Sequence, residues 1–285
     1  MKISIVIPAF REAGIIGTVI KSIYSLLPDA EMIVVDDGSD DDTAEVARRA
    51  GATVYSHPYN IGNGAAVKTG IRMATGDLIV MLDGDGQHNP EDIPRLLAMA
   101  ETHDMVVGAR DSKTQANIFR KCANAFYNFL ASYITKINVK DLTSGFRVVH
   151  KKTAMRYLYL LPNTFSYPTT ITLSYLHSGL SICYLPIQAA KRTGKSKIRP
   201  LHDGIQFLLI IIKITTLYSP LLIFLPTSLF FMLLGLFNYC YTFTTTHRFT
   251  NMSALLLISA VMIFMLGLIS EQITQLRYDR VDNKK

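Results

Sequence analysis

The sequence predicts an α/β domain with a mostly parallel sheet, followed by an interfacial helix and two C-terminal transmembrane helices. Three observations lead to this prediction. Up to residue 200, short runs rich in Ile and Val alternate with helix-like stretches, a pattern typical of a parallel sheet flanked by helices. Two apolar segments follow at 219–241 and 252–273, and each has about the 20 residues that a spanning helix needs. The stretch between, 201–218, is apolar around Lys213 and is predicted to lie in the interface as an amphipathic helix.

Five apolar runs are predicted to form the strands of the domain at 1–200. In chain order they lie at 3–7, 32–35, 52–55, 78–82 and 105–107. Helices are predicted between these runs, at 13–27, 41–50, 64–75 and 91–102. Acidic residues open the second helix, and Pro90 and Glu91 precede the last one, as expected at helix N-termini.

Polar clusters follow three of the predicted strands. They are PAFRE at 8–12, DDGSDDDT at 36–43 and DGDGQ at 83–87. Ligands bind at the carboxyl ends of the strands in sheets of this kind. The three clusters are therefore expected to meet at one edge of the sheet.

The DGDGQ cluster has the residue types of a divalent metal site. Asp83 and Asp85 are two positions apart, so in an extended segment both side chains project from the same face. Gly84 allows the chain to turn closely around a ligand. Two carboxylates and the amide of Gln87 suit Mg²⁺ or Mn²⁺. An Asp-Gly turn that binds nothing would have a similar sequence.

The other polar clusters each have a structural and a functional interpretation. The acidic residues at 36–43 can cap the following helix, although Asp36 and Asp37 precede the turn and are better placed to accept hydrogen bonds from a base or ribose. The glycine-containing loop at 60–70 enters a helix, so its amides could face an anion. In DLTSGFR at 141–147, a plain turn with a salt bridge is the simpler interpretation.

Charge indicates a membrane partner and an orientation. The formal net charge is +7, which suits anionic headgroups or phosphates, and no aromatic and basic motif predicts nucleic acid binding. Basic residues flank the two apolar segments on the outer sides, with only Arg248 between them, so both chain ends are predicted to be cytoplasmic. The basic stretch at 191–199 either anchors the chain or holds a phosphate at the membrane surface. The three cysteines are far apart and without a CxxC pair, as in a reduced cytosolic domain.

Six motifs in this order resemble the polyprenyl-phosphate glycosyltransferases of family 2, the group of dolichyl-phosphate mannose synthase and the GtrB-like proteins. The motifs are PAFRE, DDGSDDDT, NIGNGAA, DGDGQHNPED, DLTSGFR and KRTGKSK. The resemblance covers nearly the whole chain. It implies a GT-A fold, which is a Rossmann-like sheet, in an enzyme at the bacterial inner membrane. That enzyme would transfer a sugar from UDP or GDP to undecaprenyl or dolichyl phosphate with inversion.

The resemblance also implies roles for individual residues. The metal, Mg²⁺ or Mn²⁺, would be held by Asp83, Asp85 and Gln87. The nucleotide-sugar would be held by Pro8, Phe10, Glu12, Val35, Asp37, Asp83, Gly84, Asp85 and Arg110. Catalytic roles would fall to Asp85, Asp141, Arg120 and Arg147. The acceptor phosphate or the diphosphate would contact Arg120, Lys191, Arg192, Ser196 and Lys197. The family pattern RxxGxSK places Lys191 at its first position, so either Lys191 or Arg192 could be the phosphate contact.

Such a reaction explains why carboxylates and cations gather at one site. A divalent ion helps a diphosphate to leave because it neutralises the developing charge. A polyprenyl phosphate brings its own ionised oxygen as nucleophile, so a strong general base is less necessary. Positioning and charge neutralisation are therefore expected to dominate catalysis.

Three other functions fit parts of the sequence. A processive polysaccharide synthase of the same superfamily would carry a QxxRW motif, and this chain has no Trp. A non-catalytic membrane scaffold would not need the complete set of carboxylates. A membrane-tethered transferase with a non-polyprenyl acceptor stays open. Apolar spans can also pack between protomers, so the sequence is compatible with a homo-oligomer.

Overall fold

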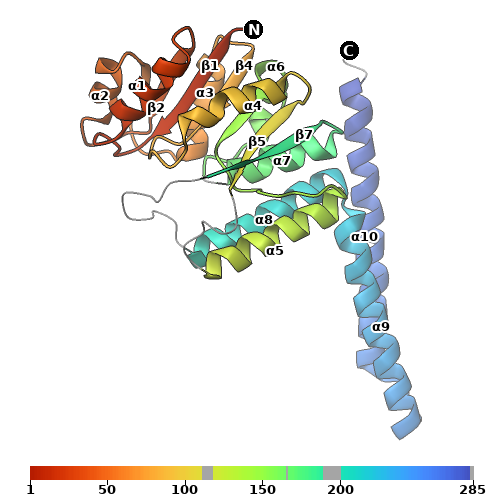
Figure 1. Ribbon diagram of the computed structural model, residues 1–285. Helices are drawn as coiled ribbons and strands as arrows, with labels where there is room; N and C mark the ends of the chain where they lie inside the picture. The colour runs from red at the N-terminus through yellow and green to blue at the C-terminus, as the bar shows by residue number, and fades with distance from the viewer. Residues whose placement is uncertain (111–117, 165, 189–199, 283–285) are drawn as a thin grey trace. The chain divides into compact units, whose positions relative to one another are not determined.

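The structure is a computed structural model that describes residues 1–110, 118–164, 166–188 and 200–282. Within these ranges, side chains are described except at 118–124, 200–207 and 277–282. The chain divides into two compact units, Met1–Ile210 and Ile211–Lys285. The first contains the sheet and the second consists mainly of two long helices (Figure 1).

The first unit is built on a seven-stranded sheet with the order β3-β2-β1-β4-β6-β5-β7. The strands are β1 (Ile3–Ala9), β2 (Glu31–Asp36), β3 (Thr53–Ser56), β4 (Leu78–Met81), β5 (Met105–Arg110), β6 (Arg147–His150) and β7 (Ile182–Ile187). All pairings are parallel except those of β6, which runs antiparallel to both β4 and β5. The predicted mostly parallel sheet and its five predicted strands are confirmed, and β6 and β7 are additional.

Helices cover both faces of this sheet. One face packs against α1 (Ile16–Leu26), α2 (Thr43–Arg49) and α4 (Ile93–Ala100), and the other against α3 (Asn63–Met73), α6 (Lys151–Tyr157) and α7 (Tyr167–His177). Short 3₁₀ helices, η1 (Pro90–Asp92) and η2 (Leu158–Leu160), precede α4 and follow α6. The remaining helix of this unit is α5 (Ile118–Thr135), and α8 (Pro200–Tyr218) spans the boundary between the units. The three-layer arrangement buries both faces of the central strands.

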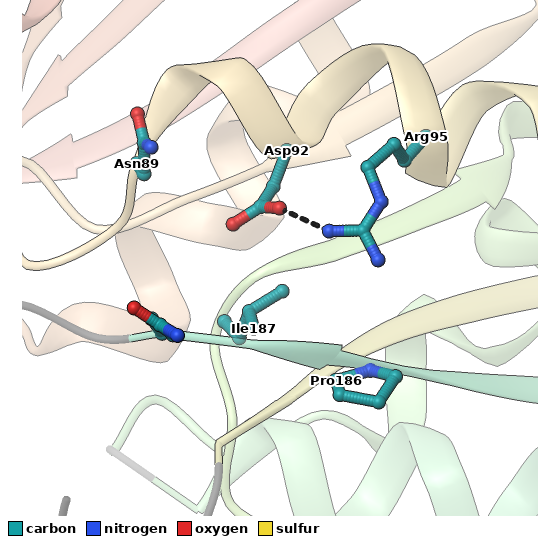
Figure 2. A pocket seen from close by; sticks show the side chains of 6 residues that line it. Asn89, Asp92, Arg95, Pro186 and Ile187 are labelled. Atoms are coloured by element: carbon teal, nitrogen blue, oxygen red, sulfur yellow. Dashed lines mark hydrogen bonds and ion pairs between the residues drawn. The ribbon is translucent and has the colours of Figure 1, made fainter.

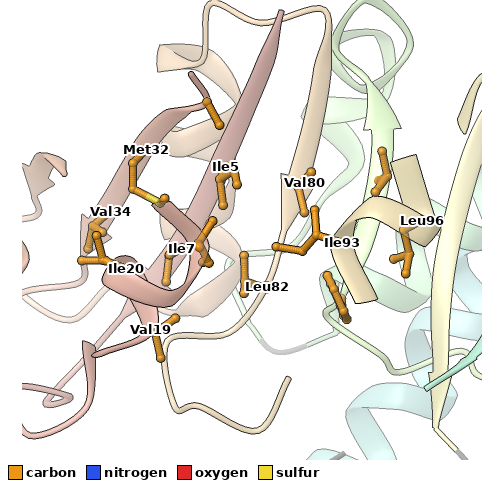
Figure 3. Close-up of a cluster of buried hydrophobic side chains, with 14 of the residues drawn as sticks. Ile5, Ile7, Val19, Ile20, Met32, Val34, Val80, Leu82, Ile93 and Leu96 are labelled. Atoms are coloured by element: carbon orange, nitrogen blue, oxygen red, sulfur yellow. The ribbon is translucent and has the colours of Figure 1, made fainter. Parts of the chain in front are cut away.

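Alternation along each strand assigns its side chains to the two cores. Ile5 and Ile7 of β1 point to the face that α1 covers (Figure 3), and Val6 belongs to the opposite core. In β4, Val80 lies on the first face and Ile79 on the second. Because successive side chains of a strand point to opposite faces, continuous Ile and Val runs are the pattern expected for strands buried on both sides.

The antiparallel direction of β6 determines where the DLTSGFR motif lies. Arg147, the first residue of β6, pairs with Met81 near the end of β4 and with Val107 near the end of β5. The loop that precedes β6 therefore reaches the same edge of the sheet as the carboxyl ends of β4 and β5. A parallel strand at this place would have put the motif at the opposite edge.

The second unit contains a hairpin of two apolar helices, α9 (Leu221–Thr246) and α10 (Asn251–Asp282). Within it, Leu221–Thr246 and Asn251–Leu276 are each 26 residues long, with mean hydropathies of 2.1 and 2.6, and are long and apolar enough to cross a membrane. Buried small residues recur every seventh position on α10, at Ser253, Ala260, Gly267 and Thr274. Small residues let two helix backbones approach closely in lipid. Most large apolar side chains of the hairpin are exposed, as expected for lipid-facing surfaces.

Candidate active site at the carboxyl edge of the sheet

Five segments meet at the carboxyl edge of the parallel strands. Residues 10–12 follow β1, residues 37–42 follow β2, residues 82–89 follow β4, Arg110 ends β5 and residues 141–146 precede β6. The prediction that the PAFRE, DDGSDDDT and DGDGQ clusters share one edge is therefore consistent with the topology. The DLTSGFR loop joins them because β6 is antiparallel.

The segments that follow β1 and β2 are connected by hydrogen bonds. The backbone N–H of Glu12 donates to Thr43 Oγ1 at 2.8 Å, and that of Arg11 donates to Ser39 Oγ at 2.9 Å. Arg11 has a φ of 55°, and its guanidinium lies 5.1 Å from the ring centre of Phe10 and forms an exposed ion pair with Asp40 at 2.6 Å. A non-glycine residue in the left-handed region is uncommon and concentrates at functional sites. Phe10 and Glu12 are both half-buried, so each has surface to offer to a ligand.

Asp37 is a buried residue whose carboxylate has partners within the protein. It accepts hydrogen bonds from the backbone N–H groups of Ile61 at 3.1 Å and Gly62 at 2.8 Å. The ring of His57 lies between Asp37 and Thr69, with Nδ1 2.7 Å from Asp37 Oδ1 and Nε2 3.0 Å from Thr69 Oγ1. Asp37 therefore holds the loop before α3 against the end of β2, whatever its role toward a nucleotide.

Two other residues predicted to hold the nucleotide-sugar lie in or beside β1 and β2. Val35 is fully buried in the core beneath α3, so its side chain has no free surface. Pro8 is buried in β1 and pairs with Val35. Gly84 lies beside them, because a Cβ at this position would be 3.3 Å from the Pro8 carbonyl oxygen. These three residues shape the backbone of the site, and contact with a nucleotide stays a prediction for each of them.

The glycine-containing loop at 60–70 packs against protein backbone. A Cβ at Gly62 would lie 2.3 Å from the Asn163 carbonyl oxygen, and one at Gly64 would lie 2.1 Å from that of Pro162. The amides of Ile61 and Gly62 donate to Asp37, and that of Ala65 to the carbonyls of Gly62 and Asn163. These partners explain the loop without an anion, and an anion contact at this helix N-terminus stays a prediction. The glycines instead permit close approach of the 162–164 segment.

The DGDGQ segment leaves β4 with both carboxylates half-buried. Asp85 Oδ1 accepts a hydrogen bond from the backbone N–H of Gln87 at 3.2 Å, which tightens the turn. The Asp83 N–H points to Nδ1 of His88 at 3.4 Å. The His88 ring is buried 5.1 Å from that of Phe146, and burial lowers the pKa of His88 despite Asp83 and Asp85. The burial of His88 and its contacts with Asp83 and Phe146 favour a supporting role for this residue.

Arg110 and Asp141 form the central ion pair of the site. Arg110 Nε is 2.9 Å from Asp141 Oδ2, its Nη2 is 3.1 Å from Oδ1, and its backbone N–H also donates to Oδ2 at 3.2 Å. Burial alone would raise the pKa of Asp141, but the Arg110 guanidinium and the hydrogen bonds lower it overall. Burial would lower the pKa of Arg110, and Asp141, with Asp83 and Asp85 nearby, raises it. Asp141 thus fixes a permanent cation beside the two carboxylates.

Arg147 is fully buried on the face that α7 covers. Its Nε donates to the Ser144 carbonyl at 2.7 Å, Nη1 to Thr172 Oγ1 at 2.6 Å, and Nη2 to the Leu142 carbonyl at 3.3 Å. The residue shares the parity of Val149 in β6, so its side chain points into the core. Burial lowers the pKa of Arg147. This geometry supports a role in holding the 141–146 loop, whereas a contact with phosphate would require the side chain to leave the core.

A conservative substitution separates these two roles. Arg147→Lys keeps the charge but cannot reach three acceptors in different directions, so we expect the free energy of unfolding to fall by about 2 kcal/mol. The donor KM is expected to stay within about twofold of wild type. Thermal unfolding and donor titration of the detergent-solubilised chain measure both quantities. A large rise in donor KM at unchanged stability would instead show that Arg147 acts directly on the donor, as its predicted catalytic role implies.

Several predicted residues lie outside the described part of the chain. Lys191, Arg192, Ser196 and Lys197 fall within 189–199, and Arg120 lies in α5 at a position whose side chain is not described. Their roles stay predictions from the sequence.

A cavity of about 320 Å³ lies next to the carboxylate segments and does not include Asp83 or Asp85. It is lined by Asn89, Asp92, Arg95, Pro186, Ile187 and Gln188. Figure 2 shows Asp92 and Arg95 on one wall, joined by a 2.7 Å ion pair, opposite Pro186 and Ile187 of β7. The cavity adjoins residue 188, after which the basic stretch begins.

Two supporting residues were not identified from the sequence. Asn128 of α5 donates to the Lys140 carbonyl at 2.8 Å and accepts from the Leu142 N–H at 3.1 Å, so it fixes the start of the 141–146 loop. Gly145, in the middle of that loop, lies directly against the Asp83 carboxylate. No local sequence signal marks Asn128, whereas the glycine within DLTSGFR was visible as part of a motif.

The residues at the carboxyl edge fit a metal that is shared with a substrate. In the described ranges, no group of three or more His, Cys, Asp or Glu side chains could hold an ion. Asp83 and Asp85 are half-buried residues in the turn at this edge. Mg²⁺ is commonly bound through one or two carboxylates, with water and substrate phosphates at its other positions. Such a donor set suits an ion that arrives with a diphosphate.

Comparison with known proteins gives two family matches on this chain. The model for glycosyl transferase family 2 matches residues 4–158, and the model for the GtrB C-terminal hairpin matches residues 219–276. The first match includes the strands β1 to β6 and the helices up to α6. The second match includes the two apolar helices.

Individual relatives are similar over about half of the chain. An undecaprenyl-phosphate 4-deoxy-4-formamido-L-arabinose transferase of Proteus mirabilis is 36% identical over 150 residues, which are 49% of this chain and 46% of that protein. The protein of the same name from Yersinia enterocolitica is 32% identical over 188 residues, 59% of this chain and 58% of the relative. The chain thus spans about half the length of the curated relatives that it matches.

Solved structures share the fold of the first unit. Glucosyl-3-phosphoglycerate synthase from Mycobacterium tuberculosis, in complex with Mn²⁺ and uridine-diphosphate-glucose, superposes with a TM-score of 0.61 at 23% identity. The superposition covers 75% of this chain and 79% of that one. The likeness confirms the expected fold class.

Proposed function

Because the chain belongs to glycosyl transferase family 2, we propose that it transfers a sugar from a UDP- or GDP-linked donor to a polyprenyl phosphate. One observation carries the choice of acceptor: a family 2 domain and a GtrB-type helical hairpin occur in the same chain. The relatives named as undecaprenyl-phosphate sugar transferases support the same class of acceptor. The proposed product is a polyprenyl-phosphate sugar for cell-envelope glycans or protein glycosylation, with inverted configuration at the anomeric carbon.

We propose that Asp83 and Asp85 hold a divalent ion together with the donor diphosphate, with Gln87 beside them. Mn²⁺ accompanies uridine-diphosphate-glucose in the structural relative, which supports Mg²⁺ or Mn²⁺ for this chain. When bound, the ion would neutralise charge that develops on the leaving diphosphate. Both residues lie half-buried at the carboxyl edge of the sheet, where ligands bind in folds of this kind.

The protein's own contribution is positioning and electrostatics. Arg110 is held by Asp141 next to Asp83 and Asp85, so its cation is preorganised for a phosphate oxygen or for balancing the carboxylates. Asp141 keeps a lowered pKa and all its described contacts are to the protein, which favours a supporting role over that of a base. The acceptor phosphate is already ionised and needs little proton removal.

The donor nucleoside is proposed to lie over the ends of β1 and β2. Phe10, under the guanidinium of Arg11, offers an aromatic surface for a base, and Glu12 is half-buried next to it. The exposed Arg11–Asp40 ion pair borders the proposed nucleoside site on its solvent side. Asp37 supports it from below through the loop before α3.

A membrane location is proposed from exposed apolar surfaces in each unit. α5 exposes aromatic side chains on one face, Phe126, Phe129 and Tyr133, at 54%, 68% and 60% of their areas. Aromatic side chains of this kind prefer the membrane interface, and α8 is proposed as a second interfacial helix. The hairpin at 219–276 is proposed to span the bilayer with both chain ends in the cytoplasm, as the flanking positive charges predict.

An acceptor panel tests the proposal against its main alternative. Detergent-solubilised protein is given each nucleotide-sugar with undecaprenyl phosphate, dolichyl phosphate or soluble phosphorylated and hydroxyl acceptors. The account predicts transfer to a polyprenyl phosphate only. Transfer to a soluble acceptor alone would favour a membrane-tethered transferase with a different acceptor, and the absence of transfer and of donor binding would favour a scaffold.

The basic stretch before the membrane provides a separate prediction. Lys197→Ala is expected to weaken use of the lipid phosphate, with a several-fold rise in its KM, because one cation at the headgroup plane is lost. Donor hydrolysis in the absence of acceptor is expected to change little. Parallel assays of transfer and of hydrolysis measure the two effects, and equal losses in both would assign Lys197 to the donor diphosphate.

A further inference from the structure

Gly145 is buried against the side chain that is proposed to hold the metal. A Cβ added at this position would lie 2.8 Å from Asp83 Oδ2 and 3.2 Å from both Asp83 Cγ and Oδ1. These three nearest atoms are the whole carboxylate group of Asp83. The Asp83 carboxylate therefore occupies the space that a side chain at residue 145 would fill.

The loop around Gly145 is fixed on its other side. The hydroxyl of Ser144 donates to the Gly108 carbonyl at 2.7 Å, and the Phe146 carbonyl accepts from the Gly108 N–H at 2.9 Å. Phe146 is fully buried and its ring packs on His88. The 144–146 backbone is thus attached to β5, so it cannot retreat from Asp83 without breaking these bonds.

The contact differs in kind from those of Gly62 and Gly64. At Gly62 and Gly64 an added Cβ would meet backbone atoms, so a substitution there would have to move the chain. At Gly145 the three nearest atoms that it would meet belong to the end of the Asp83 side chain, which can rotate away. The φ of Gly145 is not in the left-handed region, so alanine is compatible with the backbone. A substitution at this position is therefore expected to move the carboxylate and leave the fold in place.

We propose that Gly145 is a positioning residue whose lack of a side chain sets the location of the Asp83 carboxylate for the metal and the donor diphosphate. The inference rests on the proposed function, and it goes beyond it by giving the glycine of DLTSGFR a defined task. Arg147 and Asn128 hold the loop from below and from α5, and Gly145 transmits that fixed position to Asp83. Metal sites depend on such supporting contacts because they orient the ligands.

A double-mutant cycle on the full chain in detergent tests this positioning role. The variants are Gly145→Ala, Asp83→Ala and the double variant, with Gly17→Ala as a matched control. Gly17 lies in α1, and a Cβ there would meet only the Val46 side chain at 3.1 Å. Two quantities are measured: the Tm without metal, and the affinity for Mn²⁺ by calorimetry in the presence of UDP and, separately, of GDP.

The effect of Gly145→Ala on the Tm is expected only when Asp83 is present. Gly145→Ala should weaken Mn²⁺ binding by about tenfold or more and lower the Tm by a few degrees, while Gly17→Ala changes neither by a comparable amount. In the Asp83→Ala background, Gly145→Ala should cost no further Tm, because the atoms that it would displace are gone.

Two results would overturn the proposal: wild-type Mn²⁺ affinity in Gly145→Ala, or a Tm loss that is equally large with and without Asp83. Failure of wild-type protein to bind Mn²⁺ with UDP and with GDP would count against the proposed function, and the metal-free Tm cycle would still decide whether Gly145 positions Asp83. Even a strongly destabilised Gly145→Ala remains informative, because removal of Asp83 should then restore stability.

Discussion

Replacement of Asp85 by alanine is expected to abolish sugar transfer, with a loss of at least about 10³-fold in kcat/KM. Asp85 is a half-buried residue in the turn after β4, where its carboxylate accepts a hydrogen bond from the Gln87 N–H. Its loss removes a proposed metal ligand but little packing, so the Tm should change by only a few degrees. Radiolabel transfer and thermal unfolding, measured on the same preparation, separate the two effects.

The matched control for this substitution is Asp29→Ala. Asp29 is exposed in the turn between α1 and β2, so the charge change is the same and the site is untouched. Asp29→Ala should retain wild-type transfer. Undiminished turnover in Asp85→Ala would remove Asp85 from the reaction.

Replacement of Asp141 by asparagine is expected to have the largest effect on stability. Asp141 is buried and pairs with Arg110, whose side chain is 28% exposed. Removal of one partner leaves a largely desolvated cation, which costs about 3 kcal/mol. Transfer should also fall strongly, because Arg110 loses the contact that fixes it beside Asp83 and Asp85. Denaturant or thermal unfolding of the solubilised chain measures the stability change.

The pH dependence of that stability loss tests whether the loss comes from the ion pair between Asp141 and Arg110. The pKa of Asp141 is lowered in the folded protein, so its contribution is present above the unfolded value of about 3.9 and is lost as pH falls through the folded value. The difference between wild type and Asp141→Asn should therefore be full at pH 7 and shrink below about pH 4. A difference that stays constant through this range would show that the carboxylate charge is not its source.

Much of the fold could be predicted from the sequence because the central strands are buried on both faces. Their Ile and Val runs are continuous, and two of the helices between them have N-terminal signals, namely acidic residues at α2 and Pro90 with Glu91 before α4. β6 and β7 were missed for identifiable reasons. β6 has four residues and begins with Arg147, so it reads as the end of a turn. β7 contains Pro186, and proline demotes a run unless the strand lies at the edge of a sheet, as β7 does.

The location of the site could also be predicted, but the task of each side chain could not. Asp37, Asp83 and Arg110 lie at the ends of parallel strands, so all three are expected at one edge of the sheet, whichever residues they contact. Asp37 contacts residues between 57 and 62, and Arg110 contacts Asp141. The spacing of residues along the chain does not predict contacts of this kind. The buried position of Arg147 follows from strand parity with Val149, which is visible only once β6 is recognised as a strand.

The account also explains why one chain combines these two parts. A donor that is soluble requires a site open to water, and an acceptor phosphate stays at the headgroup plane. The family 2 domain is proposed to supply carboxylates and Arg110 for the donor, and the GtrB-type hairpin is proposed to keep the chain near the acceptor. Neither part alone would specify a polyprenyl phosphate as the acceptor.

The most direct test is transfer of radiolabel from a panel of UDP- and GDP-sugars to undecaprenyl phosphate, with Mg²⁺ or Mn²⁺ and with a chelator. The account predicts label in the lipid fraction from at least one donor, dependent on the metal and abolished in Asp85→Ala. No lipid label from any donor, while the protein is folded by its thermal transition, would contradict the proposed function.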